Sequence, residues 1–247
     1  MDNLVQFINE LQTDKNFGAY DEASVKLSII LKILSLLGWD LFDINEIQPD
    51  YNTNKQKIDF VLKQNDSLEV FLMVKKDFYD SKSHIETLLY SSEMSAVKIA
   101  IYTNGFSWSF FLPYADGSID DKKFCVIDTG KDKTELIARG LHDFLSKENV
   151  ISGHAVKLAE EICNKRKAVM SINATLPMAW EKVINEPEKY LIDVISKVTK
   201  ELCGYKPDQE EVVDFIRAKG KIRSIKSENY EMEDLTQIGD DKPQNRY

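Results

Sequence analysis

The sequence has few cysteines and no long apolar segment. Its three cysteines, Cys125, Cys163 and Cys203, are far apart and show no paired spacing, which argues against a disulfide framework or a zinc site. No run of about 18 or more apolar residues is present, and the N-terminus does not have the pattern of a secretory leader. We therefore expect a soluble, cytoplasmic protein that does not associate with a membrane.

The chain also lacks an excess of positive charge. It has 32 basic and 41 acidic side chains among its 247 residues, which gives a formal net charge of −9. Such a balance disfavours a protein that coats nucleic acid non-specifically, because phosphate binding needs clustered cations. Two dense basic clusters remain, Lys75-Lys76 and the stretch 217–226. Total charge therefore leaves nucleic-acid binding open.

The first part of the chain alternates between helical and extended patterns, which is typical of an α/β domain. We assign this α/β domain to residues 1–148, with a mixed β-sheet flanked by helices. The pattern predicts helices at about 1–15, 22–37, 81–94 and 133–146, and extended segments at about 44–51, 57–63, 68–76, 96–103, 106–112 and 124–128. Within it, Asn104-Gly105 is a strong two-residue hairpin signal, because both residues tolerate positive φ.

From about residue 149 the pattern is helical only. We expect a helical appendage over 149–219, with a first helix from Ser152 to about 168 and a separate short helix from Leu176 to Val183. A third helix begins near Pro187 and ends at Gly204, and Asp208 caps a fourth. Residues 220–247 are polar and highly charged, and their composition predicts a disordered tail.

The most informative segment is the hairpin 58–76. Two apolar runs flank the polar stretch 64–67, which is of the kind that turns a chain. A turn centred there places Asp59 opposite Met73, and Met73 on the same side as Lys75. Two carboxylates here would share a divalent cation, while a lysine positions water and stabilises charge on a phosphate. Only one acid is present, because Glu69 lies about 13 Å from position 73 at roughly 3.3 Å per residue.

At these residues the sequence resembles the PD-(D/E)xK nuclease core, and particularly the N-terminal nuclease domain of type I restriction enzyme R subunits. The resemblance covers about residues 20–145. It implies a restriction-endonuclease-like fold. The stretches that carry it, besides the hairpin, are Asp21-Glu22-Ala23, Leu36-Leu37-Gly38-Trp39-Asp40, Glu86-Thr87-Leu88-Leu89-Tyr90 and Ile101-Tyr102-Thr103-Asn104-Gly105-Phe106-Ser107-Trp108. Because no phosphate loop of the form GxxxxGK[ST] is present, the chain is not a complete R subunit with its motor.

The resemblance also implies a set of site residues. Asp59, Glu22 and Glu86 would be metal ligands, and the same three acids with Lys75 would form the catalytic set. Two positions depart from the family pattern: Met73 replaces the motif glutamate, and Glu86 replaces a glutamine. Glu86 enters the set as a carboxylate that has migrated to the helix after the hairpin. Magnesium is the implied cofactor if the site is active.

Each of these residues also has an ordinary structural interpretation. Asp59 would be a surface aspartate, Lys75 a solvated strand end and Met73 an apolar core residue. Glu22 would be an acid favoured by the dipole at a helix N-terminus. Glu86 would be a solvated helix residue.

Two hypotheses follow. The first is a degenerate nuclease that keeps the fold and binds DNA or a protein partner in a restriction or phage-defence setting. The second is an active magnesium-dependent DNA endonuclease that uses Asp59, Lys75 and a migrated acid, Glu86 or Glu22. Homo-oligomerisation is left open. The discriminating observation is whether two acids and the lysine converge within about 4 to 6 Å.

Overall fold

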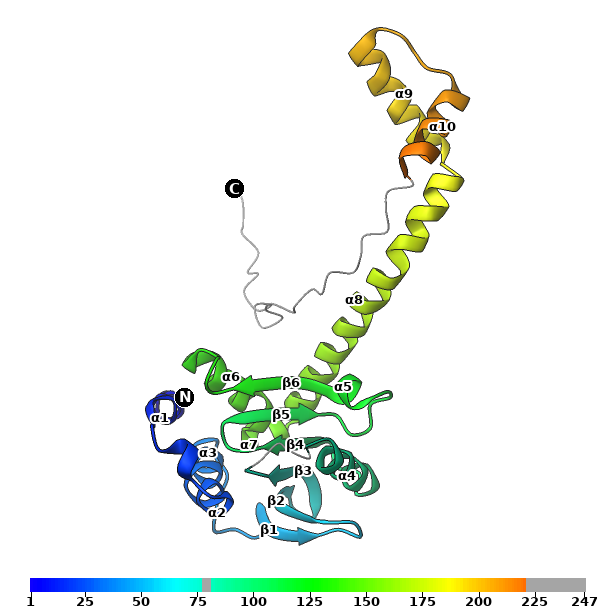
Figure 1. The fold of residues 1–247 in the computed structure, drawn as a ribbon. Helices are drawn as coiled ribbons and strands as arrows, with labels where there is room; N and C mark the ends of the chain where they lie inside the picture. The colour runs from blue at the N-terminus through cyan, green and yellow to red at the C-terminus, as the bar shows by residue number, and fades with distance from the viewer. Residues whose placement is uncertain (77–80, 221–247) are drawn as a thin grey trace, which may run out of the picture. The chain divides into compact units, whose positions relative to one another are not determined.

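The computed structural model of the chain describes residues 1–76 and 81–220 (Figure 1). It divides into two compact units, Met1–Val169 and Met170–Tyr247. The charged tail expected at 220–247 lies outside the described residues, apart from Gly220. No helix in the described ranges combines the length and the apolar character needed to cross a membrane.

In the described part of the first unit, six strands form one sheet in the order β1-β2-β3-β4-β5-β6. Neighbouring strands are antiparallel, except that β3 and β4 run parallel. The strands are β1 Ile47–Asn52, β2 Lys57–Gln64, β3 Ser67–Val74, β4 Ile99–Thr103, β5 Ser107–Phe111 and β6 Lys123–Asp128. The expected α/β class, a mixed sheet flanked by helices, is confirmed.

The β2–β3 hairpin has the register that its turn residues predict. Phe60 pairs with Leu72 and Val61 with Phe71. The residue at the turn, Asn65, has φ of 53°, a conformation that asparagine tolerates better than most residues. Asp59 directly precedes the paired series, so it lies at the end of the hairpin where β3 finishes.

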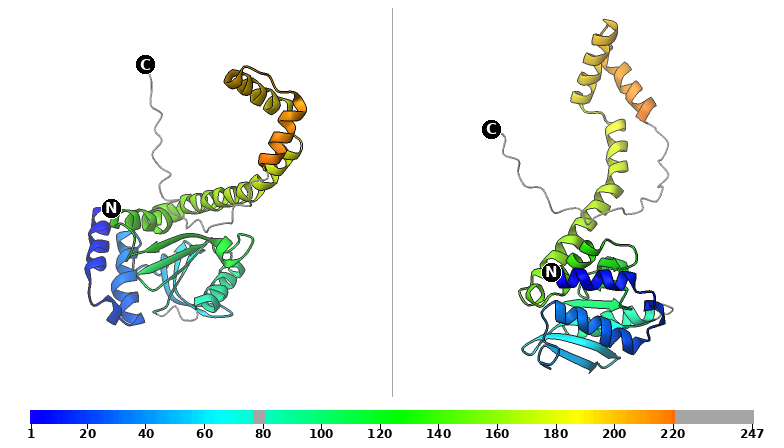
Figure 2. Two further views of the ribbon diagram at one scale, coloured as in Figure 1. Left: turned by 45° about the horizontal axis from the view of Figure 1, so that its top comes forward. Right: turned by 90° about the vertical axis from the view of Figure 1, so that its left-hand side faces the viewer.

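Both faces of the sheet are covered by helices, because strand side chains alternate between two apolar clusters. On one face, Leu62 and Leu72 pack under helices α1, α3, α6 and α7, and on the other, Val61 and Phe71 pack under α4 (Figure 2). The covering helices are α1 Asp2–Thr13, α3 Leu31–Leu36, α4 Ser81–Met94, α6 Thr134–Leu145 and α7 Lys147–Ile151. Two short helices, η1 Phe17–Ala19 and α5 Ile119–Lys122, connect elements. Each fully buried large side chain contributes about 1.5–3 kcal/mol.

The helix expected at 22–37 has the expected extent but is not uniformly α-helical. It consists of α2 (Glu22–Ser24), a π-helical segment η2 (Val25–Ile30) and α3 (Leu31–Leu36). Asp21 caps its N-terminus, since the Ser24 N–H donates to the Asp21 carboxylate at 2.7 Å. A π segment of this kind has no sequence signature that we used, and such segments are frequent at functional sites.

The β4–β5 hairpin turns at Asn104-Gly105, as predicted. The Asn104 side-chain oxygen accepts the N–H groups of Phe106 and Ser107 at 3.0 and 2.7 Å. Gly105 has φ of +85°, and a Cβ atom there would lie 2.6 Å from Cγ1 of Val25. The hairpin tip therefore touches η2, and glycine is required both by the backbone and by this contact.

The helices expected from Ser152 to 168 and from Leu176 to Val183 form one helix, α8 (His154–Asn185), so the predicted interruption is wrong. Pro177 lies inside it, where proline removes one N–H donor without stopping the helix in this chain. The beginning of α8 packs into the first unit through Ala155, Ala159 and Cys163. For this reason residues 149–169, which we had assigned to the appendage, group with the first unit.

The described part of the second unit, up to Gly220, is helical. Its other described helices are α9 (Lys189–Cys203) and α10 (Gln209–Gly220). Gly204 ends α9 with φ of 82°, and the Asp208 carboxylate accepts the Glu211 N–H at the start of α10. A small core joins the three helices through Ile184, Ile192, Val212 and Ile216.

Candidate functional site

Four charged side chains meet in a chain of ion pairs that joins the helix of Glu22 to β2 and to the end of β3. The elements that carry them are labelled in Figure 1. Glu22 and Lys26 come from the helix, Asp59 comes from β2, and Lys75 directly follows β3. We call these four residues the charged cluster. The two helix residues are more than 30 residues away in sequence from the two strand residues. The cluster is therefore assembled by the fold and not by local sequence.

Asp59 is the most buried member, with 8% of its surface exposed. Its Oδ2 atom accepts the Val74 backbone N–H at 2.7 Å, and its Oδ1 atom lies 2.6 Å from Nζ of Lys26. Both carboxylate oxygens are therefore engaged by donors of the protein itself. A buried carboxylate needs such partners, because unpaired charge away from water is strongly unfavourable.

Glu22 links the two lysines. Its Oε1 atom lies 2.5 Å from Nζ of Lys26 and 3.4 Å from Nζ of Lys75. Burial alone would raise the pKa of the Glu22 carboxyl, but the hydrogen bond and charge of Lys26, and then of Lys75, bring that pKa below its ordinary value. The geometry also brings Glu22, Asp59 and Lys75 into one site, as the resemblance implies.

Lys26 is the residue that the sequence interpretation missed. Burial lowers the pKa of its ammonium, but hydrogen bonds to Asp59 and Glu22 outweigh that effect and raise it. Two carboxylates and two ammonium groups give the cluster a formal charge of zero. A signal was available, since Glu22 and Lys26 have the i, i+4 spacing of a helical ion pair. That spacing does not reveal that the pair faces a strand.

Met73 occupies the position of the motif glutamate and is an apolar core residue, as its ordinary interpretation holds. It is 2% exposed and packs in the cluster that contains Val61, Phe71 and Leu88. Its side chain has no oxygen atom and therefore cannot act with Asp59 as a ligand of a divalent cation.

Glu86 does not join the charged cluster. It is exposed on α4 and borders a shallow depression with Lys55, Thr87 and Tyr90. Among the described residues it forms no hydrogen bond or ion pair with Asp59, Glu22 or Lys75. The structure thus brings together three of the four predicted site residues and leaves the fourth on the surface.

The charged cluster does not fit a divalent cation. Magnesium takes near-octahedral oxygen ligands at about 2.0–2.1 Å. Here the ammonium group of Lys26 already contacts both carboxylates, and Asp59 also accepts the Val74 N–H. Within the ranges that the structure describes, no group of three or more Asp, Glu, His or Cys side chains is arranged to hold a metal ion.

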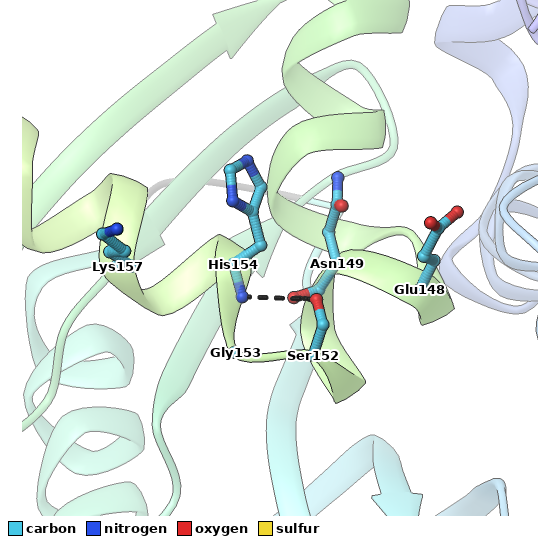
Figure 3. Close-up of a pocket in the computed structure, with 6 residues that line it drawn as sticks. All are labelled: Glu148, Asn149, Ser152, Gly153, His154 and Lys157. Carbon is cyan, nitrogen blue, oxygen red and sulfur yellow. Dashed lines mark hydrogen bonds between the residues drawn. The ribbon is translucent and has the colours of Figure 1, made fainter.

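A second depression lies at the junction of α7 and α8 (Figure 3). The depression is lined by Glu148, Asn149, Ser152, Gly153, His154 and Lys157. Within it, the Ser152 hydroxyl accepts the His154 backbone N–H at 3.4 Å. These side chains form no ion pair with one another in the described structure, and the depression is open to solvent, so we assign it no chemistry.

Comparisons of the chain with protein-family models, with curated proteins and with solved structures found no match. A functional conclusion must therefore rest on the geometry of the charged cluster. That geometry combines two carboxylates with two ammonium groups at the end of a β-hairpin.

Proposed function

We propose that the chain is a DNA-associated protein with a restriction-endonuclease-like, PD-(D/E)xK scaffold, and that it is a degenerate nuclease of a restriction or phage-defence setting. One observation carries the proposal. Glu22, Asp59 and Lys75, each supplied by a different element, converge at the end of one hairpin. These are three of the four residues that the sequence resemblance names for this chemistry.

The sheet arrangement supports the same ancestry. The hairpin β2–β3 is antiparallel, and β4 then joins β3 in parallel, after a crossover that contains α4. This arrangement leaves Asp59 and Lys75 at the same end of two adjacent strands. A phosphate placed at that end would meet a carboxylate and an ammonium group together, as phosphoryl-transfer sites require.

Two features argue that hydrolysis has been lost. A metal-dependent nuclease needs a cation that activates water and stabilises the developing charge. Met73 stands where the resembled family has a second strand acid and packs in the apolar core, and Lys26 contacts both Glu22 and Asp59. We therefore favour binding over catalysis for the present chain.

DNA is the partner that the exposed cations of this region fit best. Lys76 is exposed at the end of β3, and Lys75 is half-buried, with its Nζ atom 3.4 Å from Oε1 of Glu22. Each phosphate contact made by a lysine releases a counterion, which makes binding depend strongly on salt. With a net charge of −9 and few clustered cations, we expect weak, salt-sensitive binding.

The test combines a cleavage assay with a binding assay. Purified full-length protein should leave supercoiled plasmid uncut in the presence of magnesium or manganese. In fluorescence anisotropy, it should bind a labelled DNA duplex at low salt. The double substitution Lys75→Ala and Lys76→Ala should weaken this binding at least several-fold and make the dependence on salt less steep, by about one unit of the log–log slope for each lost contact.

A matched control removes the same charge elsewhere. Lys165→Ala with Lys167→Ala deletes two exposed lysines of α8, far in sequence from the charged cluster, and should change affinity much less. Magnesium-dependent cleavage that disappears in Asp59→Ala would instead establish the active endonuclease. If the protein does not bind DNA at low salt, binding of a protein partner would be the remaining function of the scaffold.

A further inference from the structure

Lys26 occupies the space between two carboxylates that belong to different elements. Its Nζ atom lies 2.5 Å from Oε1 of Glu22 and 2.6 Å from Oδ1 of Asp59. Bridging two carboxylates in this way is the role of a hard divalent cation in a metal site. In this chain a covalently attached cation performs that role.

We infer that Lys26 is the resident cation of the site, and that its ammonium group stands in for the metal ion of an ancestral nuclease. The charged cluster is then a self-neutralised ion-pair network that takes no divalent cation while Lys26 is present. This inference deepens the proposed function and rests on its nuclease ancestry.

The position of Lys26 is fixed by its surroundings. The residues beside it on the helix, Val25 and Ile29, are buried at 3% and 1% exposure and pack into the main core. The side chain of Lys26 is 22% exposed, which is less than that of Lys75 at 32%. Its ammonium group is therefore held against the strand ends, in contrast to a lysine on a solvated helix face.

Three of the four carboxylate oxygens of Asp59 and Glu22 are also committed. Asp59 gives one oxygen to the Val74 N–H and the other to Lys26, and Oε1 of Glu22 contacts both lysines. A divalent cation entering here would have to break these contacts and would lie beside two positive charges. Removal of the Lys26 charge should raise the affinity of the cluster for a divalent cation, because two carboxylates would then remain with a single nearby ammonium group.

The test measures the binding of Mn²⁺ to the full chain by isothermal titration calorimetry. The wild-type protein should show no saturable binding below millimolar concentrations. Lys26→Met keeps a long, unbranched side chain and removes the charge, and it should bind Mn²⁺ at least ten-fold more tightly. The control is Lys32→Met on the same helix, because Lys32 is exposed and forms no ion pair with any described residue. It should behave as the wild type does.

The added substitution Asp59→Asn should abolish the binding gained by Lys26→Met. A folded Lys26→Met protein that binds Mn²⁺ no better than the wild type overturns the inference. So does tight binding by the wild type that Asp59→Asn removes.

A second measurement applies if Lys26→Met does not fold. The thermal midpoint of the wild type should be the same in magnesium chloride and in sodium chloride of equal ionic strength. A midpoint raised by magnesium in the wild type but not in Asp59→Asn overturns the inference. Neither measurement contains DNA, so this inference and the proposed DNA binding succeed or fail separately.

Discussion

The ammonium group of Lys26 lies 2.6 Å from Oδ1 of Asp59, although Lys26 belongs to the π segment η2 and Asp59 to β2. The other carboxylate oxygen of Asp59, Oδ2, accepts the Val74 N–H, so a single carboxylate connects the helix with two strands. We expect this connection to contribute to stability as well as to define the site, because breaking a buried, hydrogen-bonded pair leaves its partner uncompensated.

Asp59→Asn should lower the free energy of unfolding by about 1–3 kcal/mol, because it removes the charge that compensates Lys26 and weakens the bond to Val74. Urea unfolding followed by circular dichroism measures the change. Asp66→Asn is the matched control: Asp66 is exposed in the β2–β3 turn, and its substitution should change stability by less than about 0.5 kcal/mol. Equal losses in the two variants would contradict the role given to Asp59.

Glu22→Gln should reduce stability at neutral pH by up to about 1 kcal/mol, since the pair with Lys26 is partly screened by solvent. Because the folded-state pKa of Glu22 lies below its ordinary value of 4.5, the advantage of the wild type should be complete above that value. It should disappear as pH falls through the lowered pKa. Thermal midpoints of both proteins between pH 3 and 8 test this. Glu161→Gln, on an exposed part of α8, should show no such pattern.

Gly105→Ala should destabilise the protein by about 1–3 kcal/mol, because alanine is strained at positive φ. The new Cβ would also lie 2.6 Å from Cγ1 of Val25. In a Val25→Ala background, Gly105→Ala should cost less than it does in the wild type, because the part of the loss that comes from this contact is absent. As a control, Gly18→Ala places a Cβ where no atom lies within 4 Å, and its effect on the thermal midpoint should be small. An equal cost of Gly105→Ala in the two backgrounds would mean that backbone strain alone accounts for the loss.

The three cysteines should differ in reactivity toward a thiol reagent at pH 8. Cys203 is exposed, whereas burial raises the pKa of the Cys125 thiol to about 12 and also raises that of Cys163. Since the thiolate is the reactive form, the native protein should show one fast thiol and the denatured protein three. Cys203→Ser should remove the fast phase. Two fast thiols in the native wild type would be inconsistent with the burial of Cys125 and Cys163.

Local turn and cap chemistry made much of the fold predictable. The β2–β3 register followed from its polar turn, the β4–β5 hairpin from Asn104-Gly105, and the end of α9 from Gly204. These signals act within a few residues and need no tertiary information. The interruption expected between about residue 168 and Leu176 does not occur, since α8 continues through this stretch and through Pro177.

The candidate site was only partly predictable. Asp59, Lys75 and Glu22 could be named from hairpin spacing and resemblance, but the partner that joins them, Lys26, could not. Which side of a helix faces the strand ends depends on how its apolar side packs. Here that packing is further altered by a π segment. Glu86 illustrates the reverse case, since it lies on the expected helix but away from the charged cluster.

The π segment η2 (Val25–Ile30) has one more consequence. At 3.6 residues per turn, losing one residue from the positions after Lys26 would restore a regular α-helix and swing the residues before the deletion by about 100°. The apolar side of α3 would stay on the sheet, while Glu22 and Lys26 would turn away from Asp59. A single-residue deletion could therefore dismantle the charged cluster and displace Val25, while the apolar side of α3 stays on the sheet.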